Sequence, residues 1–154
     1  MDLDDFNCGS DFSDDAYRQY QQQKERIDQL PVMVKAREIF EITYALTEAF
    51  EADDDSLRLR ERMMESACTL GPKIAGAEAG DFYTIRMENA VLIKMSARDL
   101  QAQNSLLMSE NLVDASYTLL LRKSIQDFRE LFVEWVASFD RNNDIEDGWG
   151  TLFR

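Results

Sequence analysis

The sequence contains no histidine, which is the commonest general base and metal ligand among protein side chains. That absence excludes a serine–histidine or cysteine–histidine nucleophile within one chain, and it excludes the Glu-x-x-His motif of di-iron bundles. A glycine-rich phosphate loop ending in Lys-Ser or Lys-Thr is also missing. The sequence therefore predicts a protein that is not an enzyme, with no catalytic residue, no cofactor and no metal site.

Cysteine, proline and glycine are scarce. The two cysteines, Cys8 and Cys68, cannot build a disulfide framework, so we expect two free thiols, with Cys68 in a buried helix. Two prolines and six glycines argue against the many tight turns of an all-β sandwich. No apolar run approaches the roughly 20 residues that span a bilayer, and the acidic start lacks the pattern of a secretory signal. The expected location is the cytoplasm, away from membranes.

Basic side chains are outnumbered, with 17 Lys and Arg against 30 Asp and Glu and a net charge of −13. Residues 1–30 carry 8 acids and 3 bases, residues 31–139 carry 18 and 12, and residues 140–154 carry 4 and 2. The acidic excess is thus spread along the chain. Binding to nucleic-acid phosphate depends on clustered bases, and only Arg58, Arg60 and Arg62 stand close together. The charge argues against nucleic acid as a partner.

The chain does contain four long amphipathic segments. Apolar residues recur at spacings of three and four over about 31–50, 56–78, 82–103 and 110–139. Asp53–Asp55, Gly80–Asp81 and Asn104–Ser105 separate them as short polar connections. This pattern predicts an all-α fold, an antiparallel up-and-down four-helix bundle over residues 30–139. Its last helix, about 30 residues, would be about 45 Å long.

Both ends of the chain are expected to lie outside the bundle. Residues 1–29 are predicted to be an acidic, largely disordered tail or a frayed helix. Acids there alternate with Leu3, Phe6 and Phe12, a pattern that fits a solvated tail or a short docking motif. Residues 140–154 are predicted to be a short C-terminal tail. Its Trp149, Leu152 and Phe153 favour docking into a groove or plain disorder.

The stretch Ser66–Phe82, SACTLGPKIAGAEAGDF, is unusually rich in small residues. Glycine in a helix interior costs roughly 1 kcal/mol and proline about 3 relative to alanine, so close packing should compensate. We expect a kink near Pro72, a left-handed helix end at Gly80 and a helix cap at Asp81. The alternative is two short helices meeting at Gly71–Pro72. The predicted helix-packing and kink residues are Ala67, Gly71, Pro72, Ile74, Ala75 and Gly80.

Two of the segments carry apolar residues on more than one face. A helix with a second apolar face either lies in the middle of a bundle or contacts another subunit. We therefore expect self-association into a homo-oligomer. The residues assigned to that contact are Val34, Ile42, Ala45, Met87, Val91 and Met95.

Two segments, VMVKAREIFEITYALTEAF and RERMMESACTLGPKIAGAEAG, are followed by a long helix pair. In these segments and that pair, the chain resembles the four-helix bundle proteins encoded in 23S rRNA intervening sequences. The resemblance covers about residues 30–139, and Ser66–Gly80 is its most specific stretch. The family pattern there is roughly Arg-Arg-Ala-x-Ser-Ile-Pro-x-Asn-Ile-Ala-Glu-Gly. This chain keeps its small, hydroxyl and aliphatic positions as Ala67, Thr69, Leu70, Ile74 and Ala75. It departs at Met64 and Glu65, where the arginine pair would stand, at Gly71-Pro72, where the proline is shifted by one, and at Lys73, where Asn is usual.

The resemblance implies a non-enzymatic bundle that assembles into rings, often of five. A basic, ring-forming relative acts as an accessory factor in retroelement diversification. The expected function is therefore a non-catalytic homo-oligomeric scaffold that binds an unknown protein partner. The expected assembly is a ring, for which a pentamer is one candidate. The first alternative is a nucleic-acid-associated accessory protein, although this chain lacks the basic pair.

The second alternative is a bundle that binds a metal or a small ligand. Asp140, Asn142 and Asp144 follow the start of an EF-hand loop, but Ile145 and Thr151 replace its Gly and Glu. Paired carboxylates are the other route to such a site, although most of the candidates fall opposite the apolar stripes. The candidates are Glu38, Glu41, Glu48, Glu88, Asp127 and Glu134.

Overall fold

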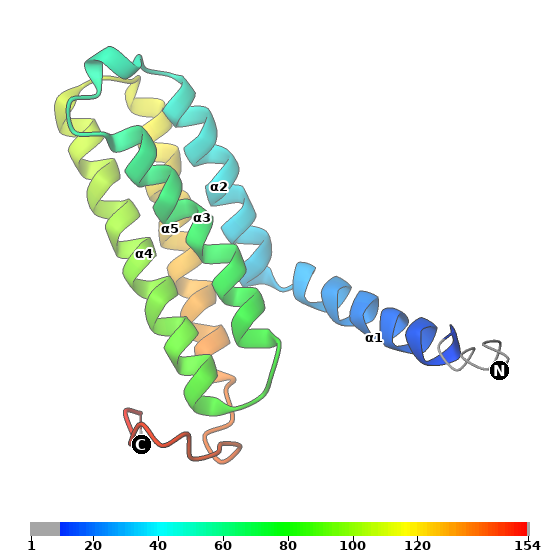
Figure 1. Ribbon diagram of the computed structural model, residues 1–154. Helices are drawn as coiled ribbons and strands as arrows, with labels where there is room; N and C mark the ends of the chain where they lie inside the picture. Colours follow the sequence, from blue (N-terminus) through cyan, green and yellow to red (C-terminus); the bar gives the residue numbers. More distant parts are fainter. Residues whose placement is uncertain (1–9, 154) are drawn as a thin grey trace, which may run out of the picture. The chain divides into compact units, whose positions relative to one another are not determined.

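The computed structural model describes residues 10–153, with side chains from Ser13 onward (Figure 1). These residues contain five α-helices, one short 3-10 helix and no strand, so the predicted all-α class is confirmed. The chain divides into two compact units, residues 1–30 and 31–154. The elements are α1 (Ser10–Asp28), α2 (Pro31–Glu48), η1 (Ala52–Asp54), α3 (Leu59–Glu78), α4 (Tyr83–Glu110) and α5 (Ala115–Ala137).

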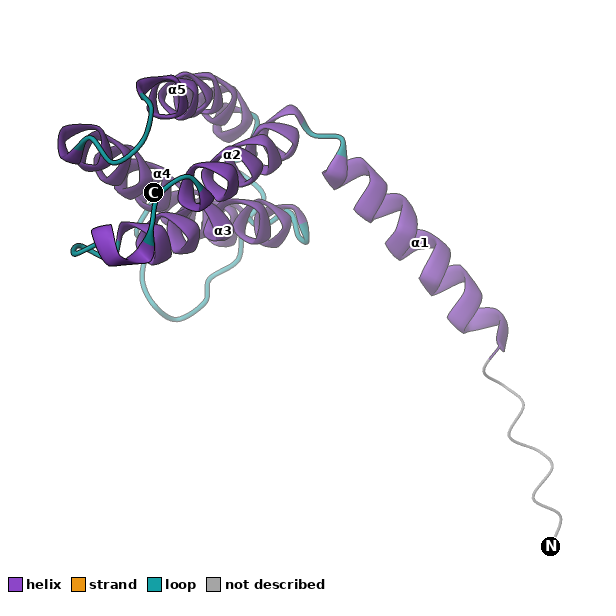
Figure 2. Cartoon of the chain, turned by 90° about the horizontal axis from the view of Figure 1, so that it is seen from above, coloured by secondary structure: helices purple, strands orange, loops and turns teal. Residues whose placement is uncertain are grey.

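Helices α2 to α5 form a helical bundle in the second unit. Helices α2 and α4 each pack against both α3 and α5, so they lie diagonally across the bundle (Figure 2). Every helix contributes fully buried apolar side chains to the core, and each such side chain contributes roughly 1.5–3 kcal/mol. The most deeply buried are Ile39, Leu46, Leu59, Met63, Leu70, Ile74, Ile93, Leu100, Leu107, Leu121 and Phe128.

Helix α3 begins at Leu59, three residues later than the predicted Ser56. The Asp55 carboxylate accepts hydrogen bonds from the backbone N–H of Leu59 at 2.6 Å and of Arg60 at 2.9 Å. These bonds satisfy donors that have no partner within the helix, at the end where the helix dipole favours an anion. The acidic run thus serves as the helix entry, through its last member.

The connection predicted at Asn104–Ser105 is wrong. Helix α4 continues to Glu110, and the chain turns at residues 111–114, where Asn111 has a positive φ of 55°. Asn104 is only 3% exposed, and its side-chain amide donates to the Thr118 carbonyl at 2.9 Å. A polar residue that resembled a loop is therefore an internal link between α4 and α5. Helix α5 is correspondingly short, 23 residues, and Asp114 caps it by accepting from the Ser116 N–H.

Helix α1 begins at Ser10, although the sequence predicted disorder to about residue 15 and a frayed helix only after that. Asp14 and Asp15 lie in its first turns, where negative charge interacts favourably with the helix dipole. Leu3, Phe6 and Cys8 lie outside the described residues, so the expectations for them stay open.

The turn between α3 and α4 differs from the prediction at both Gly80 and Asp81. Positive φ angles among the described glycines occur at Gly148 and Gly150, and Gly80 is exposed with nothing within 4 Å of an added β-carbon. The cap on α4 comes from the segment after α5. The Asp144 carboxylate accepts from the Thr84 N–H at 3.1 Å and from the Thr84 hydroxyl at 2.6 Å.

The first residues of the segment after α5 are therefore attached to the start of α4. The Tyr83 N–H donates to the Asn143 carbonyl at 2.9 Å. Farther along, Trp149 is 86% exposed and Leu152 is 73% exposed, so neither docks into a groove of its own chain. No helix in the described part of the chain is long and apolar enough to cross a membrane.

Candidate functional site

Two grooves run along α4, one shared with α3 and the other with α5. Each encloses about 440 Å³. This volume lies within the roughly 300–1,000 Å³ of sites that hold small molecules or side chains. The two grooves differ in chemistry, because one is lined by polar groups of both charges and the other by basic side chains and aromatic rings.

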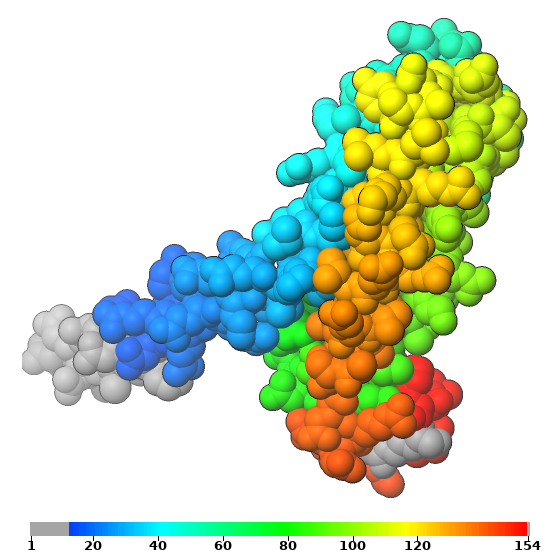
Figure 3. Space-filling view, turned by 180° about the vertical axis from the view of Figure 1, so that it is seen from behind, coloured from blue at the N-terminus to red at the C-terminus, as the bar shows by residue number. Residues whose placement is uncertain are grey.

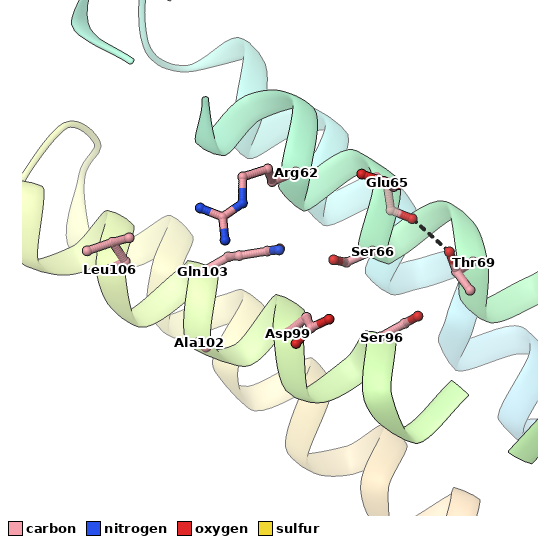
Figure 4. Close-up of a pocket in the computed structure, with 9 residues that line it drawn as sticks. All are labelled: Arg62, Glu65, Ser66, Thr69, Ser96, Asp99, Ala102, Gln103 and Leu106. Carbon is pink, nitrogen blue, oxygen red and sulfur yellow. Dashed lines mark hydrogen bonds between the residues drawn. The ribbon is translucent and has the colours of Figure 1, made fainter. Parts of the chain in front are cut away.

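The α3–α4 groove is polar (Figure 4). Arg62 and Gln103 reach toward each other from opposite helices, and Ser66, Thr69 and Ser96 add hydroxyl groups. The remaining lining residues are Glu65, Asp99, Ala102 and Leu106. A groove with donors, acceptors and both charges suits a small polar ligand.

Gln103 is the most constrained polar group in that groove. It is 8% exposed, and its Oε1 is buried with no hydrogen-bond partner. An unpartnered buried acceptor costs about 1–3 kcal/mol. By contrast, the Thr69 hydroxyl is satisfied within its own helix, because it donates to the Glu65 carbonyl at 2.9 Å.

The α4–α5 groove combines an apolar floor with a basic rim. Ile125 and Phe128 are buried in the floor, Phe132 is half-buried, and Val133 is 61% exposed beside them. Lys94, Arg98 and Arg129 stand on the rim, and no acidic residue is among the lining side chains. Figure 3 shows α5 (yellow to orange) along the surface with α4 (yellow-green) beside it. An acidic chain therefore has one locally basic, aromatic groove.

A buried ion pair joins three helices near the α3–α4 turn. Glu78 Oε1 accepts from Arg86 Nη2 at 2.6 Å and from Trp135 Nε1 at 2.7 Å. The Glu78 and Arg86 side chains are 7% and 14% exposed, and the Arg86 guanidinium lies 4.0 Å from the centre of the Phe139 ring. This cluster fixes the ends of α3, α4 and α5 to one another, and we assign it a structural role.

The predicted packing residues separate into two groups. Ala67 and Ile74 are buried in the core, while Gly71 and Ala75 are half-buried. Pro72 lies inside an uninterrupted α3 on its exposed side, so the alternative of two short helices is wrong. The closest approach falls at Gly76 instead, where an added β-carbon would lie 3.0 Å from Asn89 Oδ1. Cys68, predicted to be buried, is a free and exposed thiol.

The predicted self-association residues fall on α2 and α4. Val34 is 53% exposed, Met95 is 56% exposed, and Val91 is 39% exposed. Ala45 is exposed as well, while Ile42 and Met87 are half-buried. The structure thus brings the residues of each helix to its outer side, and it places the two sets diagonally across the bundle.

Three of the candidate carboxylates, Glu38, Glu48 and Asp127, pair with bases. Lys35 forms ion pairs with Glu38 and with Asp127, the latter at 3.8 Å, and Arg60 Nη2 lies 3.4 Å from Glu48 Oε1. The Lys123 ammonium donates to Asp127 at 2.8 Å, and this hydrogen bond lowers the pKa of the Asp127 carboxyl. Among the described residues, no three His, Cys, Asp or Glu side chains gather in a way that could hold a metal ion.

The EF-hand-like residues have structural uses as well. Asp144 binds Thr84, and Asp140 Oδ1 accepts from the Asn142 N–H at 2.9 Å, as in a tight Asx turn.

The sequence analysis missed the ion pair and the two grooves. One signal for the ion pair was available, because Glu78 follows Ile74 by four residues on the small-residue face of its helix, where an acid needs a buried partner. No comparable local signal marks Lys94, Arg98 and Arg129. Comparison of the chain with known protein families, with curated proteins and with solved structures finds no match.

Proposed function

We propose that the protein is a non-catalytic, homo-oligomeric helical scaffold, in which α2 to α5 form an antiparallel up-and-down bundle. In support of that topology, the chain connections alternate between the two ends of the bundle (Figure 1). The observation that carries the functional proposal is the exposure of large apolar side chains on two diagonal helices. Val34 and Tyr44 of α2 are 53% and 55% exposed, and Val91 and Met95 of α4 are 39% and 56% exposed.

Two different patches on opposite helices favour a head-to-tail contact, in which α2 of one copy packs on α4 of the next. Such a heterologous contact closes into a ring when the rotation between copies allows it. Rings of five are what the resemblance to the intervening-sequence proteins implies. A partner protein would then bind to a multivalent surface, which strengthens weak contacts.

Sedimentation velocity of the full chain tests this proposal. The expected result is a discrete oligomer whose self-association weakens when Val34→Lys or Met95→Lys introduces a charge into one patch. Leu119→Lys is the matched control, because Leu119 is 54% exposed but lies on α5, outside both patches. A parent chain that stays monomeric at high micromolar concentration would refute the proposal, and so would a Leu119→Lys variant that dissociates as fully as the other two.

Binding of a small polar ligand is the second candidate function. The polar lining of the α3–α4 groove favours it, because Arg62, Ser66 and Gln103 offer hydrogen-bonding groups to one cavity. Screening small polar metabolites and divalent ions by thermal shift should then give hits that Gln103→Leu abolishes. Hits that survive this substitution would place any ligand elsewhere.

A further inference from the structure

Helix α1 carries two exposed tyrosines on one face. Tyr17 and Tyr20 are 63% and 60% exposed and lie three residues apart, on one side of the helix. Helix α1 belongs to a unit of its own, residues 1–30. A helix of this length draws most of its stability from packing of its apolar side against another surface. Such a surface is therefore expected to exist.

The charge on α1 is uneven along its length. Asp14 and Asp15 precede Tyr17, and the bases Arg18, Lys24 and Arg26 all follow it. Of these bases, Arg18 lies 4.0 Å from Asp15, in an ion pair that is open to solvent. The aromatic side chains therefore stand next to a local negative charge.

The α4–α5 groove has the opposite character. Its rim residues Lys94, Arg98 and Arg129 form no ion pair within the described part of the chain, although acids outnumber bases 30 to 17 overall. Its floor offers aromatic and aliphatic surface at Phe132 and Val133. A groove of about 440 Å³ accommodates large side chains, and tyrosine brings much contact area at low cost in rotamer entropy.

We propose that the α4–α5 groove receives α1 of a second copy of this chain. Tyr17 and Tyr20 pack on Phe132 and Val133, and Asp14 and Asp15 face the basic rim. The inference rests on the proposed homo-oligomer and specifies a contact within it. Exchange of a terminal helix between copies is a common, low-cost route to assembly.

The exchange is compatible with the head-to-tail contact proposed above. Helix α1 leads into α2 through Gln29 and Leu30, so only a short connection separates the two segments proposed to contact a neighbour. When α2 packs on the outer side of the neighbour's α4, the α4–α5 groove lies along one flank of that same helix. Both contacts then use one pair of subunits, and the acidic helix adds direction to an otherwise apolar interface.

The test uses full-length variants in sedimentation velocity at low salt. A groove variant carries Lys94→Glu, Arg98→Glu and Arg129→Glu, and a helix variant carries Tyr17→Ser and Tyr20→Ser. Each is expected to weaken self-association about 10- to 100-fold, because each variant removes several exposed ion pairs or two aromatic contacts at once. A charge-matched control carries Arg58→Glu, Lys73→Glu and Arg141→Glu, outside both grooves, and it should associate like the parent.

Mixing the two variants separates exchange between copies from packing within one copy. The groove variant still has an intact α1, and the helix variant still has an intact groove. The mixture should therefore form heterodimers that are tighter than the self-association of either variant. A mixture with no heterodimer overturns the inference. Parent-like assembly of the groove variant also overturns it but leaves the proposed scaffold standing, whereas a monomeric parent chain removes both.

Discussion

Substitution of Glu78 should destabilise the bundle far more than substitution of an exposed acid. Glu78 is nearly buried and accepts two charge-assisted or buried hydrogen bonds, from Arg86 and Trp135. Glu78→Gln keeps an acceptor oxygen but leaves the Arg86 charge without a counter-ion. The Arg86 side chain is only 14% exposed, so water compensates poorly for the lost counter-ion.

The magnitude follows from these two partners. A hydrogen bond to a charged group contributes about 1.5–3 kcal/mol, so Glu78→Gln should lower the free energy of unfolding by about that amount. Glu78→Ala removes both bonds and leaves a buried charge unpaired, which costs about 3–5 kcal/mol. For a chain of this length, each kcal/mol lowers Tm by roughly 2–4 °C. The double variant Glu78→Met/Arg86→Met should recover most of the loss, because replacing a buried pair by apolar side chains is often neutral.

Urea unfolding at one fixed protein concentration provides the assay. In a Trp149→Phe background, Trp135 is the only tryptophan, and its fluorescence reports directly on the cluster. The matched control is Glu61→Gln, since Glu61 pairs with Arg58 but is 65% exposed, and such pairs contribute about 0–1 kcal/mol. If Glu78→Gln costs no more than Glu61→Gln, the cluster does not hold the helix ends together and the reasoning fails.

Three further predictions concern the helix cap, the pH dependence and the alternative function. Asp144→Ala should lower the free energy of unfolding by about 0.5–2 kcal/mol, measured by urea unfolding, because it removes the cap on Thr84; an unchanged midpoint would contradict the cap. Lys123 lowers the pKa of Asp127 and has its own pKa raised, so their stabilisation is present between about pH 4 and 10. The stabilisation is lost as pH falls through the folded pKa of Asp127, and again as pH rises through the folded pKa of Lys123. Urea midpoints at several pH values should show both losses. In the Asp127→Asn variant, neither loss should occur. Filter binding at low salt should detect no retention of RNA or DNA, and steeply salt-dependent retention would restore the nucleic-acid alternative.

The all-α class could be predicted because buried helix faces impose a period of 3.6 residues on the sequence. Ile39, Leu46, Leu70, Ile74 and Leu100 occupy predicted stripes, and all five are fully buried. The same reasoning does not predict the burial of each single residue in a stripe. Leu119 fits the periodic pattern of the last helix but is 54% exposed.

Helix boundaries were predicted poorly because their signals are tertiary. Asn104 is polar and was assigned to a loop, yet its partner, the Thr118 carbonyl, belongs to the next helix. The cap on α4 comes from Asp144, 60 residues beyond Thr84. Local propensity carries no information about either contact, so only the three-dimensional packing reveals them.

The grooves could not be predicted for a related reason. Lys94, Arg98 and Arg129 are ordinary exposed bases when each is considered on its own helix. They become a site only because α4 and α5 pack side by side and place them around the same cavity. Along the sequence only Arg58, Arg60 and Arg62 stand close together, whereas helix packing brings bases from two different helices to one cavity.

The two proposed contacts should respond to salt in opposite directions. A net charge of −13 per chain makes copies repel one another, and salt screens that repulsion over distances of about 10 Å at 0.1 M. Contact between the apolar patches of α2 and α4 should therefore strengthen as salt rises. Docking of the acidic α1 on the basic groove should weaken, because the attraction between them is screened too.

Each contact can be isolated by disabling the other. A Tyr17→Ser/Tyr20→Ser chain retains only the patches, so its association should tighten between 50 mM and 500 mM NaCl. A Met95→Lys chain retains only the exchanged helix, so its association should loosen over the same range. Sedimentation velocity on the two variants gives both slopes. Equal slopes would mean that one kind of surface holds the copies together, and the division between an apolar contact and a charged one would have to be abandoned.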